Sequence, residues 1–135
     1  MNANQQGLSQ TEQTEQVVRI FTDGAGARPD GKGSGFGYLR PDTGEKQAIR
    51  EDGLTNNQAE YKGIILALET LPAGSIVQIC TDSELICAQL NGLYHVRDPK
   101  LALLCTTVQD VIRRKGLRAK FAWVPREENL AGKLF

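Results

Sequence analysis

Residues 55–92, TNNQAEYKGIILALETLPAGSIVQICTDSELICAQLNG, carry the patterns of a helix, a strand and a second helix in direct succession. Thr55 is an N-cap residue, and Gln58 three positions later completes a capping box. A stripe at helical spacing follows, and a Pro and a Gly end it; its members are Glu60, Gly63, Ile64, Ala67, Leu68 and Leu71. Ile76–Thr81 is a short apolar strand, and Ser83–Leu90 is a second helix. This alternation predicts an α/β fold.

The segments on either side extend this unit to a five-stranded sheet. Three strand-like segments precede it, and a tight turn at residues 41–44 joins the last two: Val17–Thr22, Phe36–Arg40 and Gln47–Arg50. A helix at Lys100–Lys115 and a strand at Arg118–Val124 follow it, and the last ten residues begin another helix. We therefore predict a mixed sheet in which an antiparallel meander of three strands is joined by two parallel strands through crossover helices.

Composition sets the domain count and excludes several classes of protein. The chain has 135 residues, 40% of them hydrophobic, which predicts one domain over residues 17–135. Residues 1–16 are mostly Gln, Asn, Glu, Ser and Thr, and we expect a disordered polar tail there. The 16 basic and 16 acidic residues balance, which argues against a strongly basic, non-specific DNA-binding protein. No apolar run approaches the roughly 20 residues that span a bilayer, and no signal-peptide pattern is present. We expect a cytoplasmic monomer without membrane contact.

The cysteines and the single histidine do not form a recognisable metal site. Cys80, Cys87 and Cys105 lie in apolar segments without a CxxC pair, and we expect buried, reduced thiols. His95 has no cysteine at zinc-finger spacing and is expected at the surface or in a groove. These patterns exclude a structural zinc site.

Three acidic residues are the candidate reactive groups. Asp23 and Asp82 each follow an apolar strand and a Thr, at the carboxyl ends where α/β sheets bind ligands. Glu60 lies on the apolar stripe of the first helix, where an ionised carboxylate is uncommon unless it is paired or bound to a metal. Each acid also has an innocent interpretation: Asp23 as a turn residue, Asp82 as a helix N-cap, and Glu60 as a first-turn acid favoured by the helix dipole. If all three converge, a hard cation such as Mg²⁺ or Mn²⁺ relieves their repulsion.

Four motifs in this order resemble type 1 ribonuclease H, in the short form found in bacteria and archaea. They are FTDGAGARPDGKGSGFGY (21–38), TNNQAEYKGIILAL (55–68), CTDSELICAQLNG (80–92) and WVPREEN (123–129). The resemblance implies a five-stranded mixed sheet with helices on both faces. It also implies an endonuclease that cuts the RNA strand of RNA–DNA hybrids with two divalent ions and leaves 5′-phosphates. By motif position, Asp23, Glu60 and Asp82 are similar to three of the four metal-binding acids of that family.

The same motifs imply the hybrid-binding residues. Gly24 and Gly26 let the backbone approach a sugar, and Asn56, Asn57 and Gln58 supply amides for 2′-hydroxyl groups and base edges. Thr55 resembles a position that holds a phosphate of the DNA strand, and Ser83 lies beside the metal site. These side chains also fit a solvated helix cap, and the two roles are compatible. Apart from these motifs, six basic residues fit either a modest positive face or a solvated helix end whose charges match the helix dipole: Arg113, Arg114, Lys115, Arg118, Lys120 and Arg126.

The sequence departs from the family pattern at the fourth acid. The family has N-x-x-A-D after the last strand, whereas this chain reads Asn129-Leu-Ala-Gly-Lys133. The gap-free register puts Lys133 at the Asp position, and a one-residue deletion puts Gly132 there; the gap-free register is preferred. Either way the fourth acid is missing, so activity is expected to be retained but reduced, with Glu127, Glu128 or a water as a substitute ligand. The chief rival is a catalytically impaired or inactive hybrid-binding module. A 3′–5′ exonuclease is less favoured because Asp23 lacks a D-x-E pattern, and a purely structural domain leaves Glu60 unexplained.

Overall fold

One mixed sheet of five strands forms the centre of the protein. A computed structural model describes residues 16–135, so the tail predicted for residues 1–16 lies, apart from Gln16, outside the described residues. The strand order is β3-β2-β1-β4-β5, and the bounds are β1 (Val17–Ala25), β2 (Gly35–Arg40), β3 (Glu45–Arg50), β4 (Ile76–Thr81) and β5 (Arg118–Trp123). β2 is antiparallel to β1 and β3, whereas β4 is parallel to β1 and β5. The predicted meander with two added parallel strands is confirmed.

Three α-helices begin at side-chain caps that satisfy free backbone N–H groups. α2 (Asn56–Glu69) has the predicted capping box, in which Thr55 Oγ1 accepts from Gln58 N and Gln58 Oε1 accepts from Thr55 N. Ser83 caps α3 (Glu84–Leu90), and Asp98 caps α4 (Pro99–Lys115). Such caps each stabilise a helix by about 1 kcal/mol. They also fix where α2 and α3 start relative to the strand ends.

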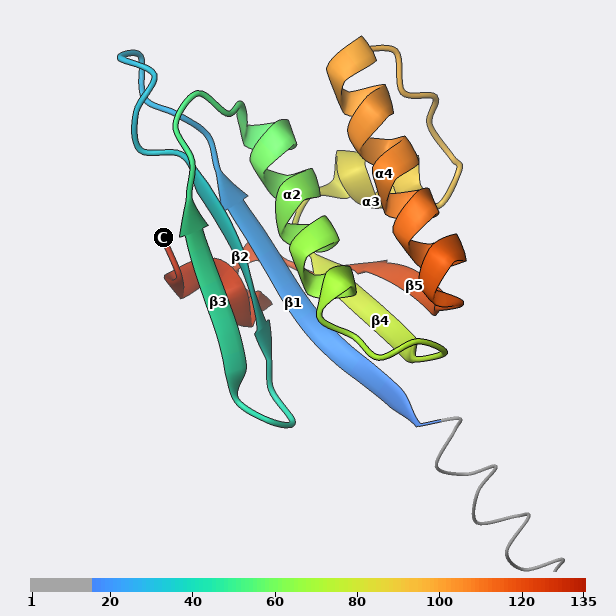
Figure 1. Cartoon of the computed structure of the whole chain (residues 1–135). Coiled ribbons are helices and arrows are strands. Elements are labelled where there is room, and N and C mark those ends of the chain that lie inside the picture. Colours follow the sequence, from blue (N-terminus) through green and yellow to red (C-terminus); the bar gives the residue numbers. More distant parts are fainter. Residues whose placement is uncertain (1–15) are drawn as a thin grey trace, which may run out of the picture.

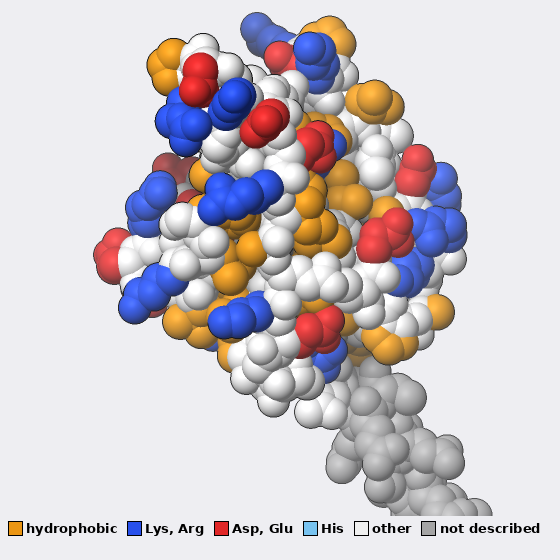
Figure 2. Space-filling view, turned by 60° about the vertical axis from the view of Figure 1, so that its left-hand side comes forward, with side chains coloured by type: hydrophobic (Ala, Val, Ile, Leu, Met, Phe, Trp, Pro, Cys, Tyr) orange, Lys and Arg blue, Asp and Glu red, His pale blue; other side chains and the backbone are white. Residues whose placement is uncertain are grey.

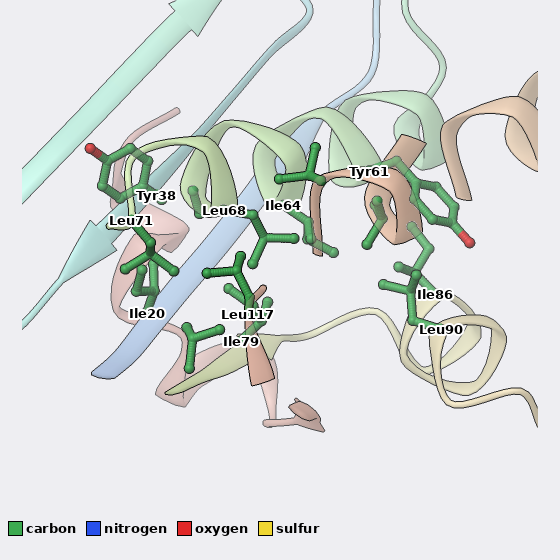
Figure 3. Close-up of a cluster of buried hydrophobic side chains, with 14 of the residues drawn as sticks. Ile20, Tyr38, Tyr61, Ile64, Leu68, Leu71, Ile79, Ile86, Leu90 and Leu117 are labelled. Carbon is green, nitrogen blue, oxygen red and sulfur yellow. The ribbon is translucent and has the colours of Figure 1, made fainter. Parts of the chain in front are cut away.

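The helices pack on one face of the sheet. Figure 1 shows α2, α3 and α4 in front of the strands, with the short carboxyl-terminal turns behind them. The main core lies between these helices and the sheet, and Figure 3 shows its central side chains from α2, α3, β1, β2 and β4 pointing toward one another. The helices on both faces that the family resemblance implies are therefore not observed in residues 16–135. The second face carries no α-helix there, only two 3₁₀ turns at one end.

Several sequence-based boundaries were wrong, and two of them affect the candidate site. β1 continues to Ala25, so Asp23 lies inside the strand with Gly37 of β2 as its antiparallel partner, rather than in a turn after it. Glu60 is the fifth residue of α2 and lies beyond the first turn, which contains no acid, so the helix-dipole interpretation fails. The last ten residues do not begin an α-helix. They form η1 (Arg126–Glu128) and η2 (Leu130–Lys133).

The cysteines are free in the described part of the chain. Cys80 and Cys87 are buried as predicted, but Cys105 on α4 is only partly buried. Of the helices in residues 16–135, none is long and apolar enough to cross a bilayer.

Candidate active site

The three candidate acids come together in a cleft at the carboxyl ends of β1 and β4. One carboxylate oxygen from each of Asp23, Glu60 and Asp82 lies within 4.8 Å of the others. Asp23 projects from β1, Glu60 from α2, and Asp82 from the residue after β4. The cleft has a volume of about 430 Å³, and Asn56, Asn57 and Ser83 are among its other lining residues. Asp23 and Glu60 are buried, whereas Asp82 is partly exposed.

Burial and mutual repulsion disfavour full ionisation of this cluster. Burial, followed by the negative charge of Asp23, raises the pKa of the Glu60 carboxyl to about 9. Burial and the charge of Asp82 also raise the pKa of the Asp23 carboxyl, while the positive charge of Arg126 acts in the opposite direction. Among the described residues Glu60 Oε2 is buried without a hydrogen-bond partner. A buried carboxylate oxygen that lacks a donor and faces two further carboxylates fits a divalent cation with a preference for oxygen ligands.

Asn129 links Asp82 to the rest of the site. Its side-chain Nδ2 donates to Asp82 Oδ2 at 3.0 Å and to the Thr22 carbonyl at 2.9 Å, and its Oδ1 accepts from Ala131 N at 3.0 Å. The residue is buried and caps η2. One amide therefore orients a candidate ligand and holds the carboxyl-terminal turns against the end of β1.

Two glycines near the acids are required for close packing. A Cβ on Gly24 would lie 2.4 Å from the backbone carbon of Ala59, and one on Gly26 would lie 2.5 Å from the backbone nitrogen of Asn56. Because these two residues have no side chains, the end of β1 packs closely against the start of α2, and Glu60 lies close to Asp23. The sequence-based reason for these glycines, close approach of a sugar, remains a prediction.

The other predicted binding residues divide into two groups. Gly24, Gly26, Asn56, Asn57 and Ser83 line the cleft. Asn56 Oδ1 accepts from Gly26 N at 2.7 Å, and Ser83 Oγ accepts from Ile86 N as the cap of α3. Thr55 and Gln58 do not line it, because their side chains close the capping box of α2.

The structure places Gly132, not Lys133, in the cleft. Gly132 lines it, whereas Lys133 is exposed and absent from its lining, as are Glu127 and Glu128 of η1. Asp23, Glu60 and Asp82 are the only acids among the lining residues of the described chain.

The cleft also contains two residues that the sequence prediction did not assign to it. Arg126, which the sequence analysis placed with other basic residues on a positive face, lines the cleft, and so does Phe135. Arg126 follows the predicted end of the last strand by two residues, and this position was the sequence signal that could have placed it in the cleft.

Solved structures of ribonucleases H have a similar fold. LC11-RNase H1 in complex with an RNA/DNA hybrid superposes with a TM-score of 0.72 at 30% identity, covering 84% of this chain and 88% of that one. RNase H1 from the halophilic archaeon Halobacterium salinarum gives a TM-score of 0.71 at 27% identity, covering 84% and 89%. The fold is thus that of the ribonuclease H-like proteins.

Sequence comparison leads to the same family. The family model described as RNase H matches residues 15–126, and the chain belongs to the ribonuclease H family. Bifunctional protein Rv2228c of Mycobacterium tuberculosis is 35% identical over 86 residues, which cover 62% of this chain and 23% of that protein. Ribonuclease H of Paramagnetospirillum magneticum is 33% identical over 81 residues, covering 58% and 52%. The chain thus spans about a quarter to about half of the length of these curated relatives.

Proposed function

We propose that this protein is an endonuclease that hydrolyses the RNA strand of RNA–DNA hybrids and leaves 5′-phosphate ends. The observation that carries the proposal is the convergence of Asp23, Glu60 and Asp82 within 4.8 Å in an open cleft. Membership of the ribonuclease H family supports it, as does the likeness to LC11-RNase H1, which was solved with a hybrid.

Asp23, Glu60 and Asp82 would hold Mg²⁺ or Mn²⁺, because carboxylate oxygens are the ligands these ions prefer. With substrate present, a pair of such ions would supply activation of the attacking water and stabilisation of the leaving 3′ oxygen. The protein itself holds these carboxylates in fixed positions relative to one another. Asp23 is fixed by strand pairing on β1, and Asp82 is oriented by the Asn129 amide. Without an ion, burial raises the pKa of both the Asp23 and the Glu60 carboxyl, which favours their protonated forms.

The rim of the cleft supplies groups that suit a hybrid. The Oδ1 of Asn56 accepts a hydrogen bond from Gly26 N, so the side-chain amide nitrogen of Asn56 can donate to a 2′-hydroxyl group. Asn57 and Ser83 add neutral polar groups along the cleft, and Arg126 adds a positive charge suited to a phosphate. Thr55 retains its hydroxyl hydrogen and Gln58 its amide nitrogen for contacts with nucleic acid, since the capping box uses only their oxygens as acceptors.

One observation favours the alternative of an impaired or inactive hybrid-binding module. Gly132 lines the cleft without a side chain, and the lining of the described chain has no fourth acid. Losing one electrostatic group from a reaction centre typically costs about 10²–10³ in rate. We therefore expect slow cleavage rather than the rate of a site with four acids.

The test is a cleavage assay on a labelled RNA–DNA hybrid with Mg²⁺ and, separately, Mn²⁺. Asp23→Asn should abolish cleavage and retain hybrid binding, whereas Asp110→Asn on the exposed surface of α4 should leave both unchanged. Hybrid binding without cleavage under either ion would support the impaired module. Failure of the parent protein both to bind and to cleave hybrid would refute the proposal.

A further inference from the structure

The second face of the sheet is largely uncovered in residues 16–135. Side chains alternate along each strand, and Phe21 of β1 belongs to the cluster beneath the carboxyl-terminal turns, whereas Ile20 belongs to the main core. Strand register extends the Phe21 face to Leu39 on β2 and to Cys80 on β4. Ala131 and Leu134 cover this row, but the rows nearer the start of β1 have no such cover. Figure 1 shows the carboxyl-terminal turns behind β2 and β3.

This second face carries an excess of positive charge. By register and alternation, five basic side chains point to it, and all are exposed: Arg19, Lys46, Arg50, Arg118 and Lys120. The only acid that the same strands place on this face is Asp23, at its far end in the cleft. None of the five cations takes part in an ion pair within the described chain.

The surface on the helix side is different. Figure 2 looks onto the β3 edge of the sheet and the helices beside it, where lysines and arginines are interspersed with acidic residues around an apolar strip. Ion pairs there include Lys62 with Glu51 and Arg114 with Glu69. The positive face predicted from the sequence is therefore divided. Arg113 and Arg114 are neutralised by partners on the helix side, while Arg118 and Lys120 lie on the second face.

Three of the five cations, Arg19, Arg118 and Lys120, are close enough for their fields to add. Arg19, Gln78 and Lys120 form one row across β1, β4 and β5. With neighbouring strands about 4.8 Å apart, the backbones at Arg19 and Lys120 are about 10 Å from each other. Arg118 lies two residues from Lys120, or about 7 Å along the strand. These separations do not exceed the screening length of about 8–10 Å at physiological salt.

We propose that this second face binds the phosphate backbone of a nucleic acid, as a contact additional to the cleft. The choice of nucleic acid rests on the proposed function. Arg50 lies opposite Gly35, against which the ring of the cleft residue Phe135 packs, so one cation of this face lies beside the cleft. An acidic protein partner fits less well, because Val17 is the only large hydrophobic side chain that the strands expose strongly on this face. A protein interface normally has a larger apolar centre.

The test measures hybrid binding by fluorescence anisotropy across a salt series, with Asp23→Asn as the parent so that the substrate stays intact. The face variant combines Arg19→Gln, Arg118→Gln and Lys120→Gln. The slope of log affinity against log salt should become shallower by about 2 to 3, because each lost phosphate contact removes about 0.9. A control variant with the same change of charge combines Lys100→Gln, Arg113→Gln and Arg114→Gln on α4. The salt slope of this control should match that of the parent. If the face variant folds poorly, Lys46→Gln with Arg50→Gln on the edge strand β3 should reduce the slope by about 1 to 2.

The outcomes separate this inference from the proposed function. If the parent binds hybrid and the salt slope of the face variant equals that of the α4 control, the proposed phosphate contact of the second face is refuted and the proposed function is not. A parent that binds no hybrid overturns both. Unchanged hybrid binding together with loss of poly-glutamate binding in the face variant would assign the face to an acidic protein instead, and would also overturn the inference.

Discussion

Replacing Asn129 tests whether one amide holds the candidate metal ligand Asp82 in place. Asn129→Ser should keep a hydroxyl oxygen that caps η2, since Ser is a good N-cap, but it is too short to donate to Asp82. Asn129→Ala should lose the cap as well. The pair of variants therefore separates a structural role in η2 from a positioning role at Asp82.

The magnitudes follow from the three hydrogen bonds of the residue. The bond to the Asp82 carboxylate is worth about 1.5–3 kcal/mol, and the bond to the Thr22 carbonyl about 0.5–1.5 kcal/mol. Asn129→Ser should thus reduce the free energy of unfolding by about 2–4.5 kcal/mol, and Asn129→Ala by about 1 kcal/mol more. Loss of a group that orients a metal ligand typically weakens metal binding by about 10–100-fold, and we expect this for both variants.

Calorimetric titration with Mn²⁺ measures the affinity, and chemical denaturation measures the stability. Asn91→Ser is the matched control, because its amide donates to the Phe121 carbonyl outside the cleft; its Mn²⁺ affinity should equal that of the parent. Wild-type Mn²⁺ affinity in Asn129→Ser, with loss only in Asn129→Ala, would show that Asn129 serves η2 alone and would refute the positioning role.

Three further predictions concern the cleft. Gly132→Asp should raise Mn²⁺ affinity and the rate of hybrid cleavage about tenfold or more, because Gly132 lines the cleft and a Cβ there meets nothing within 4 Å. Lys133→Asp should change neither, because Lys133 lies outside the cleft. Equal effects of the two substitutions would contradict the placement of Gly132, rather than Lys133, at the fourth acid position. In EDTA the melting temperature should fall as pH rises from about 5 to about 9. The pKa of Glu60 is about 9 in the folded state and 4.5 in the unfolded state, so the folded state binds an extra proton over this pH range. Mg²⁺ or Glu60→Gln should flatten the dependence of melting temperature on pH. An unchanged slope in Glu60→Gln would exclude Glu60 as the cause. Gly24→Ala should cost about 1–3 kcal/mol of stability by overpacking against α2, whereas Gly132→Ala should be near neutral; equal denaturation midpoints for the two would disprove the packing argument.

The sequence predicted the elements well because local chemistry marks their limits. The capping box at Thr55 and Gln58 sets the start of α2, and the apolar run Ile76–Thr81 coincides with β4. The convergence of the acids was inferable because an ionisable residue on the apolar stripe of α2, at Glu60, needs a partner. These features depend on spacing along the chain, which a sequence displays directly.

Other features depend on contacts between distant segments, which spacing does not reveal. The extension of β1 through Asp23 comes from pairing with β2, where Gly37 is its partner. The bonds of Asn129 join residues 107 and 47 positions apart. The final segment forms 3₁₀ turns rather than an α-helix, and Gly132 rather than Lys133 faces the cleft, because Asn129 turns the chain at the end of β1.

The central place of β1 in the sheet gives the two halves of the cleft unequal resistance to local opening. Asp23 lies on β1, which pairs with β2 at this residue and with β4 from Val17 to Phe21, so amide hydrogens of this strand should exchange with solvent mainly through unfolding of the whole domain. Asn129 and Gly132 belong to short turns at the periphery, which can detach while the sheet remains intact. On warming, the cleft should therefore lose its carboxyl-terminal wall first and keep its acids assembled until the global transition.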